Sequence, residues 1–441
     1  MTPTAAVLTI FLVTCAALIT LVFAKPAIML GGKKISIFWL APLAGAVALM
    51  VGGYLTPAEV ASGLTAAGDV NPLKILLLFF SMTMMSVYLD EIGFFRLLAH
   101  KVLAKARGSQ TTLFFLLYAL VSILTVFTSN DIIVLTFTPF ICHFAKSARI
   151  DPLPYLVSEF VAANTWSMAL IIGNPTNIYL MSGAGVSFPA YTAKMLLATA
   201  MAGIVSLGVL YLLFRKKLQA PLDPEKTPAP RIDLPTEIVG LAHLGGCIVL
   251  LSVSSFIGLP MWLITCLFFV SLLVFTMAIS FFRRRSIFLI ARCIIRAPWD
   301  LAPFVISMFI LVLALDKYGV TSALGSLLSQ PTTVGGTIAS FGISSFFAAN
   351  VVNNIPMSVL YSSVIGGMQA GALSTAALYS AVIGSNLGAF FTPTGALAGI
   401  MWTGQLHDHS VSFSFVRFVK YGAMVAIPAM AAALLGLWIC C

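Results

Sequence analysis

Apolar stretches long enough to cross a lipid bilayer recur along almost the whole sequence, and they restrict the chain to one class of fold. A helix of about 20 apolar residues spans the hydrocarbon core of a bilayer. Hydrophobic residues make up 60% of the 441 residues and charged residues only 9%, whereas a soluble domain carries roughly 25% charged residues. We therefore predict an all-α polytopic membrane protein.

The basic residues gather at the ends of these stretches, so the net charge of +10 indicates membrane topology rather than nucleic-acid binding. If the chain turns back at the polar interruptions near residues 130 and 353, nearly all Lys and Arg fall on one face. Only Lys74, Lys194 and Lys317 fall on the other. The positive-inside rule places the basic face in the cytoplasm. Both termini are then predicted to lie outside.

One charged, proline-rich stretch divides the chain into halves of similar length. It begins with "RKKLQAPLDPEKTPAP" at residue 215 and does not suit a lipid environment. We predict a first repeat at 1–214, a cytoplasmic linker at 215–235 and a second repeat at 236–441.

Three short motifs recur in the same order in both halves. They pair "LDEIG" (89–93) with "LDKYG" (315–319), "SNDII" (129–133) with "NNIPM" (353–357), and "GNPTN" (173–177) with "FTPTG" (391–395). In the topology above, the first segment of one half enters the membrane from outside and that of the other half enters from the cytoplasm. The sequence therefore predicts two inverted repeats, each with five transmembrane helices, one of them broken, and a re-entrant hairpin. This construction is typical of secondary transporters.

The first interruption in each half is predicted to be the tip of a re-entrant hairpin. The tips carry Ser129, Asn130 and Asp131 in the first half, and Asn353 and Asn354 in the second. The apolar runs beside them are short for a full crossing, although a pair of full spans would return the chain to the same side. A carboxylate at the membrane centre costs about 2.5–3.5 kcal/mol on insertion scales. Asp131 is therefore predicted to bind the coupling ion or the substrate, while helix capping is the alternative for Ser129 and Asn130.

The second interruption in each half is predicted to break a crossing helix. Glycine and proline stand in "GNPTN" and "FTPTG" where continuous helix is expected. Backbone groups freed at this depth survive only beside a polar cavity or buried in protein. The residues predicted to face the ligand at the breaks are Asn174, Thr176, Asn177, Thr392 and Thr394. Further candidates for the same cavity are Asn164, Thr165, Asn386 and Glu159, of which Glu159 has the cytoplasmic vestibule as its alternative location.

The remaining polar groups suggest neither an enzyme nor a metal centre. The seven cysteines form no CxxC pair and mostly lie in apolar runs, as small buried hydrophobic residues do. No paired nucleophile and base is evident within the apolar segments, and no GxxxxGK[ST] loop occurs. We predict that the protein is not an enzyme and uses no cofactor or metal. Asp90 and Glu91, at the end of a segment, are expected to be solvated.

Five segments resemble the arsenite permease (ArsB) branch of the ion transporter superfamily, which also contains sodium/proton antiporters and sodium-coupled divalent-anion symporters. They are "LDEIGFF", "SNDIIVLTFTP", "RAPWDLAPFVISMFILVLALDKYGV", "VVNNIPMSVL" and "IGSNLGAFFTPTGALAGIMW". The resemblance implies ten crossings, two hairpins and a scaffold that can dimerise, with a transport domain that moves against the scaffold. It also implies a location in the bacterial cytoplasmic membrane, hairpin tips at 130–131 and 353–354, and broken helices at 174–177 and 392–395.

We predict a secondary transporter that exports arsenite and antimonite in exchange for protons by alternating access. Arsenite is a neutral trihydroxide at pH 7, which suits Asn, Thr and Ser, and no cysteine falls in any of the four interruptions. The alternative is a sodium-coupled transporter of small dicarboxylates or other anions, because "GNPTN" is more similar to the helix break of citrate carriers. A sodium/proton antiporter is the third hypothesis. The expected partners are the small substrate, membrane lipid and a second copy of the chain, with docking of a soluble ATPase subunit left open.

Overall fold

The computed structural model describes residues 2–24, 27–30, 33–65, 71–106, 108–182, 184–221, 232–283 and 288–441. Within these ranges nine helical segments are long and apolar enough to cross a membrane. They are Pro3–Leu21, Pro72–Glu91, Gln110–Phe127, Phe188–Phe214, Leu234–Ser254, Met261–Phe282, Phe288–Lys317, Val334–Val352 and Phe415–Cys440. The multi-pass helical fold predicted from the sequence is confirmed.

The elements up to the predicted linker include a first hairpin of helices and a first broken helix. They are α1 (Pro3–Ala24), β1 (Ala27–Leu30), β2 (Lys33–Ser36), α2 (Leu40–Val51), α3 (Pro57–Leu64), α4 (Pro72–Glu91), α5 (Phe94–Lys105), α6 (Gln110–Phe127), α7 (Asn130–Ser147), α8 (Leu153–Trp166), η1 (Ile171–Gly173), α9 (Pro175–Ser182), α10 (Phe188–Phe214) and η2 (Lys217–Gln219). Here α6 and α7 form the first hairpin, and α8, η1 and α9 form the first broken helix.

The elements after the linker include a second hairpin and a second broken helix. They are α11 (Leu234–Ile257), α12 (Met261–Phe282), α13 (Phe288–Arg296), α14 (Leu301–Lys317), α15 (Val320–Leu328), α16 (Val334–Val352), α17 (Asn354–Gly366), α18 (Ala372–Gly388), α19 (Leu397–Asp408) and α20 (Phe415–Cys440). Here α16 and α17 form the second hairpin, and α18 and α19 form the second broken helix. The order from α14 to α20 therefore repeats the order from α4 to α10.

The paired "LDEIG" and "LDKYG" motifs form the same turn in both series. Gly93 precedes α5 with φ 87°, and Gly319 precedes α15 with φ 76°. This left-handed conformation suits glycine because glycine has no Cβ. Each turn redirects the chain from a long apolar helix into a short one that leads to a hairpin.

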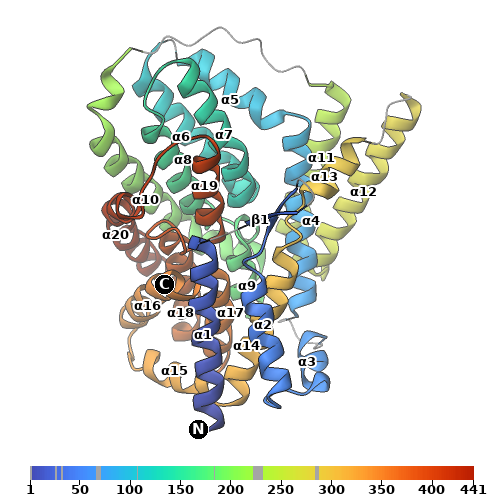
Figure 1. Ribbon diagram of the computed structural model, residues 1–441, viewed down its shortest axis with the longest axis vertical. Helices are drawn as coiled ribbons and strands as arrows, with labels where there is room; N and C mark the ends of the chain where they lie inside the picture. The colour runs from blue at the N-terminus through green and yellow to red at the C-terminus, as the bar shows by residue number, and fades with distance from the viewer. Residues whose placement is uncertain are drawn as a thin grey trace.

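The two hairpins lie toward opposite ends of the molecule. Figure 1 shows α6 and α7 in the upper half and α16 and α17 in the lower half. The return arm of each hairpin packs on the broken helix of the other series, α7 against α19 and α17 against α9. The hairpins and the broken helices therefore interlock near the middle of the fold.

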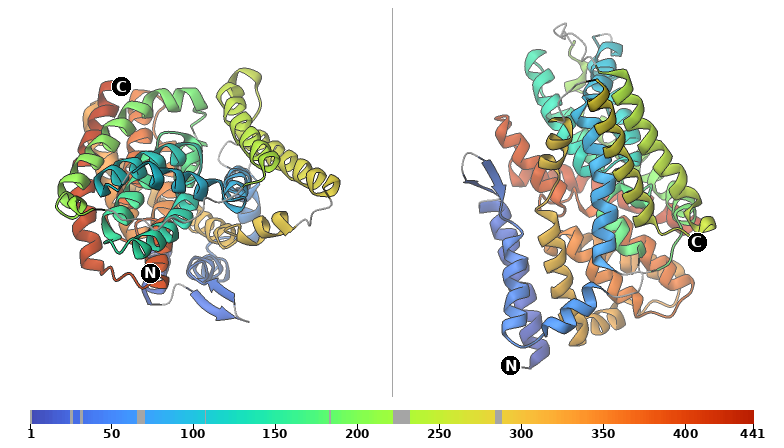
Figure 2. Two further views of the ribbon diagram at one scale, coloured as in Figure 1. Left: turned by 90° about the horizontal axis from the view of Figure 1, so that it is seen from above. Right: turned by 90° about the vertical axis from the view of Figure 1, so that its right-hand side faces the viewer.

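Two features lie outside the predicted helical pattern. Strands β1 and β2 pair antiparallel, with Ala27 opposite Ser36 and Leu30 opposite Lys33. This hairpin and α12 lie at the edge of the molecule (Figure 2). The predicted linker at 215–235 falls between the end of α10 and the start of α11, and its residues 222–231 lie outside the described part of the chain.

The expectation that Asp90 and Glu91 are solvated is wrong. Their side chains are 6% and 7% exposed and pair with Arg296 of α13, at 2.7 Å from Asp90 Oδ2 and 2.6 Å from Glu91 Oε1. Arg292 also reaches Glu91 Oε2, at 3.3 Å. The two arginines come from an amphipathic helix about 200 residues away in sequence, so the pattern around Asp90 alone could not reveal them. They hold the end of α4 against α13.

Glycine allows the closest approach of α16 to α18. A Cβ atom at Gly384 would lie 2.5 Å from the carbonyl oxygen of Gly342, and one at Gly388 would lie 2.7 Å from that of Phe346. Membrane helices pack through small residues because lipid supplies no hydrophobic driving force between helices. The second hairpin is therefore fixed to the second broken helix by direct backbone contact.

We predict that Gly384→Ala lowers the thermal unfolding midpoint of the purified protein, because the new methyl group must displace the α16 backbone. Overpacking of this kind costs about 1–3 kcal/mol. Gly245→Ala is the matched control, since a Cβ atom at Gly245 on α11 meets no atom within 4 Å. Thermal unfolding in detergent measures both, and equal midpoints for the two variants would contradict the close approach.

Candidate functional site

The first hairpin turns at Thr128 and Ser129, and its tip is buried. Ser129 occupies the N-cap position of α7, but its side chain makes no capping hydrogen bond, and its Oγ atom has no partner. Asn130 Oδ1 accepts a hydrogen bond from the backbone N–H of Asp131 at 2.9 Å. Asn130 Nδ2 donates to Asn164 Oδ1 of α8 at 3.2 Å. The Ser129 hydroxyl therefore does not cap the helix, and Asn130 connects the tip to the broken helix.

At the first break Asn177 bonds two backbone carbonyl groups, one of which, that of Leu170, also accepts from the Gly173 N–H at 3.2 Å. Asn177 Nδ2 donates to the carbonyl oxygens of Ser167, at 2.8 Å, and Leu170, at 3.1 Å. Gly173 is required there, because a Cβ atom at this position would collide with the Ser167 carbonyl group. An unsatisfied carbonyl in hydrocarbon costs several kcal/mol. One amide side chain therefore stabilises the backbone of the interrupted helix.

Asn386 of α18 connects the first break to the second broken helix. Its Oδ1 accepts from Ser167 Oγ at 2.8 Å and from Asn174 Nδ2 at 2.9 Å. Its Nδ2 donates to Asn177 Oδ1 at 2.7 Å and to its own helix at Val382 O, 2.8 Å. Since an amide has two acceptor and two donor positions, all four are filled. We call this set (Asn130, Asn164, Ser167, Asn174, Asn177 and Asn386) the asparagine network.

The second tip meets the second break through the backbone. Asn353, at φ 74°, donates from Nδ2 to Thr394 O at 2.9 Å. The backbone N–H of Asn354 donates to Gly395 O at 3.0 Å. Asn350 Oδ1 accepts from both the backbone N–H and the hydroxyl of Thr392, at 3.0 and 2.6 Å. This half of the site is therefore also held by amide side chains.

Sequence reasoning missed two residues, Ser167 and Asn350. Ser167 is fully buried, and its single hydroxyl hydrogen has two acceptors within reach, Asn164 O at 2.9 Å and Asn386 Oδ1 at 2.8 Å. Asn350 lies three residues before the predicted tip at Asn353, within "ANVVNN". Both positions fall at helix ends beside predicted residues, so adjacency to the interruptions is the sequence feature that points to them.

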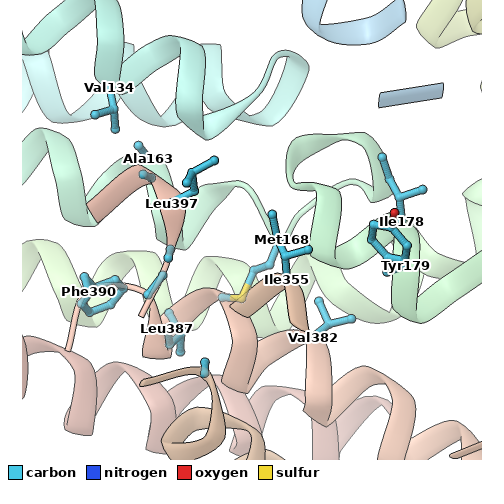
Figure 3. Packing of buried hydrophobic residues seen from close by; sticks show 14 of the residues in the cluster. Val134, Ala163, Met168, Ile178, Tyr179, Ile355, Val382, Leu387, Phe390 and Leu397 are labelled. Atoms are coloured by element: carbon cyan, nitrogen blue, oxygen red, sulfur yellow. The ribbon is translucent and has the colours of Figure 1, made fainter. Parts of the chain in front are cut away.

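Several buried polar atoms around the tips and breaks have no hydrogen-bond partner. Five of them lie on the hairpin tips, on α8, on α9 and on α18: Ser129 Oγ, Thr165 Oγ1, Thr176 Oγ1, Asn354 Oδ1 and Ser385 Oγ. Such groups are rare in native proteins, and each one calls for an explanation. Buried apolar side chains in the same parts of the chain include Met168, Ile178, Ile355 and Val382 (Figure 3). The five unpartnered atoms are all neutral hydroxyl or amide oxygens.

The carboxyl group of Asp131 lies in the first turn of α7 and is buried, at 8% exposure for the residue. Among the described residues no Lys or Arg forms an ion pair with it. Asp300, at the start of α14, interacts with it electrostatically as a like charge. A helix N-terminus favours a negative charge, which helps to hold the carboxylate. The backbone N–H of Asp131 bonds to Asn130 of the asparagine network, whereas in the described part of the chain no hydrogen bond joins its carboxyl group to that network.

The predicted residues differ in their hydrogen bonding. Asn164, Asn174, Asn177 and Asn386 are used in the asparagine network, and Asn353 and Thr392 join the second tip to the second break. Thr165, Thr176 and Asn354 present unpartnered atoms. Thr394 contributes its carbonyl oxygen to Asn353. Glu159 of α8 makes none of these contacts, and its carboxyl group lies beside the hydroxyl of Thr138 on α7.

Comparison with known proteins identifies a transporter family. The profile of the citrate transporter family, CitMHS, matches residues 19–381. The arsenical pump membrane protein of Yersinia enterocolitica is 26% identical over 416 residues, which cover 90% of this chain and 92% of that protein. The arsenical pump membrane protein of Escherichia coli K12 is 26% identical over 411 residues, with the same shares. These matches confirm the resemblance to the arsenite permease branch of the ion transporter superfamily.

Two solved transporters share the fold. The YdaH transporter of Alcanivorax borkumensis has a TM-score of 0.58 at 14% identity and covers 100% of this chain and 98% of its own. MtrF of Neisseria gonorrhoeae has a TM-score of 0.53 at 12% identity, with 98% and 94% coverage. At these identities the likeness concerns the arrangement of helices.

We predict that residues of the asparagine network and residues with unpartnered hydroxyls respond differently to mutation. Asn386→Ala leaves two partners, Asn174 Nδ2 and Asn177 Oδ1, without a hydrogen bond and lowers the free energy of unfolding by roughly 2–4 kcal/mol. Thr176→Val replaces an unpartnered hydroxyl by a methyl group of the same shape, so it leaves stability unchanged or higher and lowers transport. Thermal unfolding and substrate flux measured on both variants check this. A destabilised Thr176→Val would show that its hydroxyl is structural.

Proposed function

We propose that this chain, which belongs to the citrate transporter (CitMHS) family, exports arsenite and antimonite in exchange for protons. The family and the relatives make it a secondary transporter rather than an enzyme. The substrate and the coupling ion form the proposal, and they rest on the chemistry of the tips and breaks.

The unpartnered oxygens at the tips and breaks are the observation that carries the proposal. They are neutral hydroxyl and amide groups, and neither Lys nor Arg stands at any of the four interruptions. Arsenite and antimonite are neutral trihydroxides at pH 7, and each of their hydroxyls both donates and accepts hydrogen bonds. Neutral hydroxyl and amide oxygens match such a ligand without a charge to balance. The arsenical pump relatives agree with this substrate.

Asp131 is the residue to which we assign the exchanged proton. It is a buried carboxyl group at a hairpin tip, and no Lys or Arg in the described part of the chain forms an ion pair with it. A charge in this position is costly, so taking up a proton and releasing it changes the stability of the tip. Loss of the proton on one side of the membrane and gain on the other couples the two fluxes.

Alternating access requires two halves that exchange roles, and we propose that α4–α10 and α14–α20 are inverted repeats. The common order of elements, the paired glycine turns and the hairpins at opposite ends support this. We also propose that the linker end faces the cytoplasm. Support comes from Arg96, Lys101 and Lys105 on α5, which in Figure 1 lies at the same end as the last turns of α10 and the start of α11, while the N-terminus lies at the other.

A sodium-coupled transporter of dicarboxylates or other anions is the second candidate. The family profile bears the description of a citrate transporter, and "GNPTN" forms the first break. Bound sodium ions would supply the positive charge that the interruptions lack. The choice between the candidates is therefore a question of substrate charge and of sodium dependence.

The test is arsenite flux in inside-out membrane vesicles with an imposed proton gradient, in sodium-free buffer. Exchange with protons predicts that arsenite accumulates when the vesicle interior is acidic. Sodium-stimulated uptake of a labelled dicarboxylate in right-side-out vesicles, with no arsenite signal, would instead establish the second candidate.

We predict that Asp131→Asn reduces this accumulation to that of vesicles without the protein, because the amide cannot carry the proton. Its unfolding midpoint stays within experimental error, since the amide keeps the shape of the carboxyl group. Asp151→Asn is the control, because Asp151 is an acid that pairs with Lys217 near the linker at 2.6 Å. Undiminished proton-driven accumulation by Asp131→Asn would remove this residue from the coupling.

A further inference from the structure

A second buried carboxyl group, Glu159 of α8, lies away from the tips and breaks. Glu159 is 1% exposed. The hydroxyl of Thr138 on α7 is 3.4 Å from Oε1 and 3.3 Å from Oε2. The indole N–H of Trp402 on α19 is the other polar group near the carboxyl, although without hydrogen-bonding geometry. The carboxyl therefore has weak neutral donors only.

No positive charge of the described residues compensates Glu159. Helices α6, α7, α10 and α18 pack on α8, and α19 packs on α7. Cys142 of α7 is the titratable group on these helices that interacts with Glu159. The charged and imidazole groups at the outer ends of α7 and α19 are exposed instead: His143, Lys146, His407 and Asp408. The site is therefore buried, acidic and without a counter-ion.

Aromatic side chains pack closely around Trp402. Phe160, which follows Glu159 on α8, stacks on Trp402 with ring centroids 4.9 Å apart. Phe418 and Phe413 pack edge-on against Trp402, at 5.7 and 5.2 Å. Water is excluded by such packing, and an ionised carboxylate without water or a cation is strongly disfavoured in this setting. A neutral acid with one O–H donor avoids that cost.

We propose that Glu159 is a second proton-binding site, occupied in this conformation and emptied when α7 and α19 separate from α8. Its place in the transport cycle rests on the proposed function. Thr138 lies seven residues after Asp131, which corresponds to about 10 Å along a helix, and Cys142 follows four residues later. Positions i, i+7 and i+11 fall on one face of α7. Glu159 therefore stands beside the same face as the tip carboxyl, between it and the end of α7.

In this proposal, binding of a proton to Glu159 controls how α7, α8 and α19 pack on one another. With the proton bound, Glu159 is neutral and α7, α8 and α19 can pack around it (Figure 1). Without it, the carboxylate requires water, and water enters only if the aromatic packing opens. Since the packed state binds the proton and the hydrated state releases it, raising the pH favours the hydrated state.

Infrared spectroscopy of the purified full-length protein tests the proton directly. A protonated carboxylic acid has a C=O stretch that an ionised carboxylate lacks. We expect this band near neutral pH in the wild type and in Asp131→Asn, and its loss in Glu159→Gln. A band that is the same in Glu159→Gln and in the wild type would overturn the proposal, as would loss of the band on adding sodium at constant pH.

Thr138→Val provides a second variant if Glu159→Gln does not fold. It removes the hydroxyl that contacts both carboxyl oxygens, so it shifts the frequency of the band without abolishing it. An unshifted band would show that the protonated acid is another residue. Thr403→Ala on α19 is the matched control, because its hydroxyl bonds only to carbonyl groups of its own helix, and it leaves the band in place.

Flux measurements separate this proposal from the proposed function. Glu159→Gln is expected to lose proton-driven arsenite accumulation and to keep arsenite exchange between compartments of equal pH. If the wild type moves no arsenite, the proposed substrate fails, and the infrared band alone decides whether Glu159 holds a proton. Unchanged proton-driven accumulation by Glu159→Gln overturns its role in coupling.

Discussion

The structure depends on satisfying the backbone carbonyls that two interrupted helices expose at membrane depth. Asn177 fills this need at the first break by donating to Ser167 O and Leu170 O, and Asn386 holds Asn177 in place. Without Asn177 the Ser167 carbonyl group would lose this hydrogen bond, which costs several kcal/mol for an unsatisfied carbonyl in hydrocarbon. The same bonds join α8 and α9 to α18, so the cost of breaking a helix is offset by contacts that bring the two halves together.

We propose that the satisfied groups form the frame of the site and that the unsatisfied groups form its binding surface. Asn386 has no hydrogen-bonding position left for a ligand, so it serves as frame. Thr165, Thr176 and Ser385 each retain a buried hydroxyl without a partner, and these alternate along the chain with members of the frame. Because the frame sets the positions of these hydroxyls, substitutions in the two groups have different effects on stability and on transport.

Much of this organisation follows from the sequence because it is local. Apolar length predicts the spans, glycine in "LDEIG" and "LDKYG" predicts turns, and polar residues inside apolar runs predict the tips and breaks. Partners across the fold are not local. Arg296 lies far in sequence from Asp90, and Asn350 bonds both its own helix and Thr392. Serine and asparagine near helix ends often bond only to nearby backbone, so the position of Ser167 beside the break points to the site but not to its bond with another helix.

Binding of arsenite to the purified protein in sodium-free solution tests the central claim most directly, because it requires neither a gradient nor coupling. Titration calorimetry at neutral pH is predicted to show saturable binding of arsenite, unaffected by citrate, since neutral oxygens recognise a neutral trihydroxide. Absence of arsenite binding together with sodium-dependent binding of citrate would contradict the account and identify the site as one for anions.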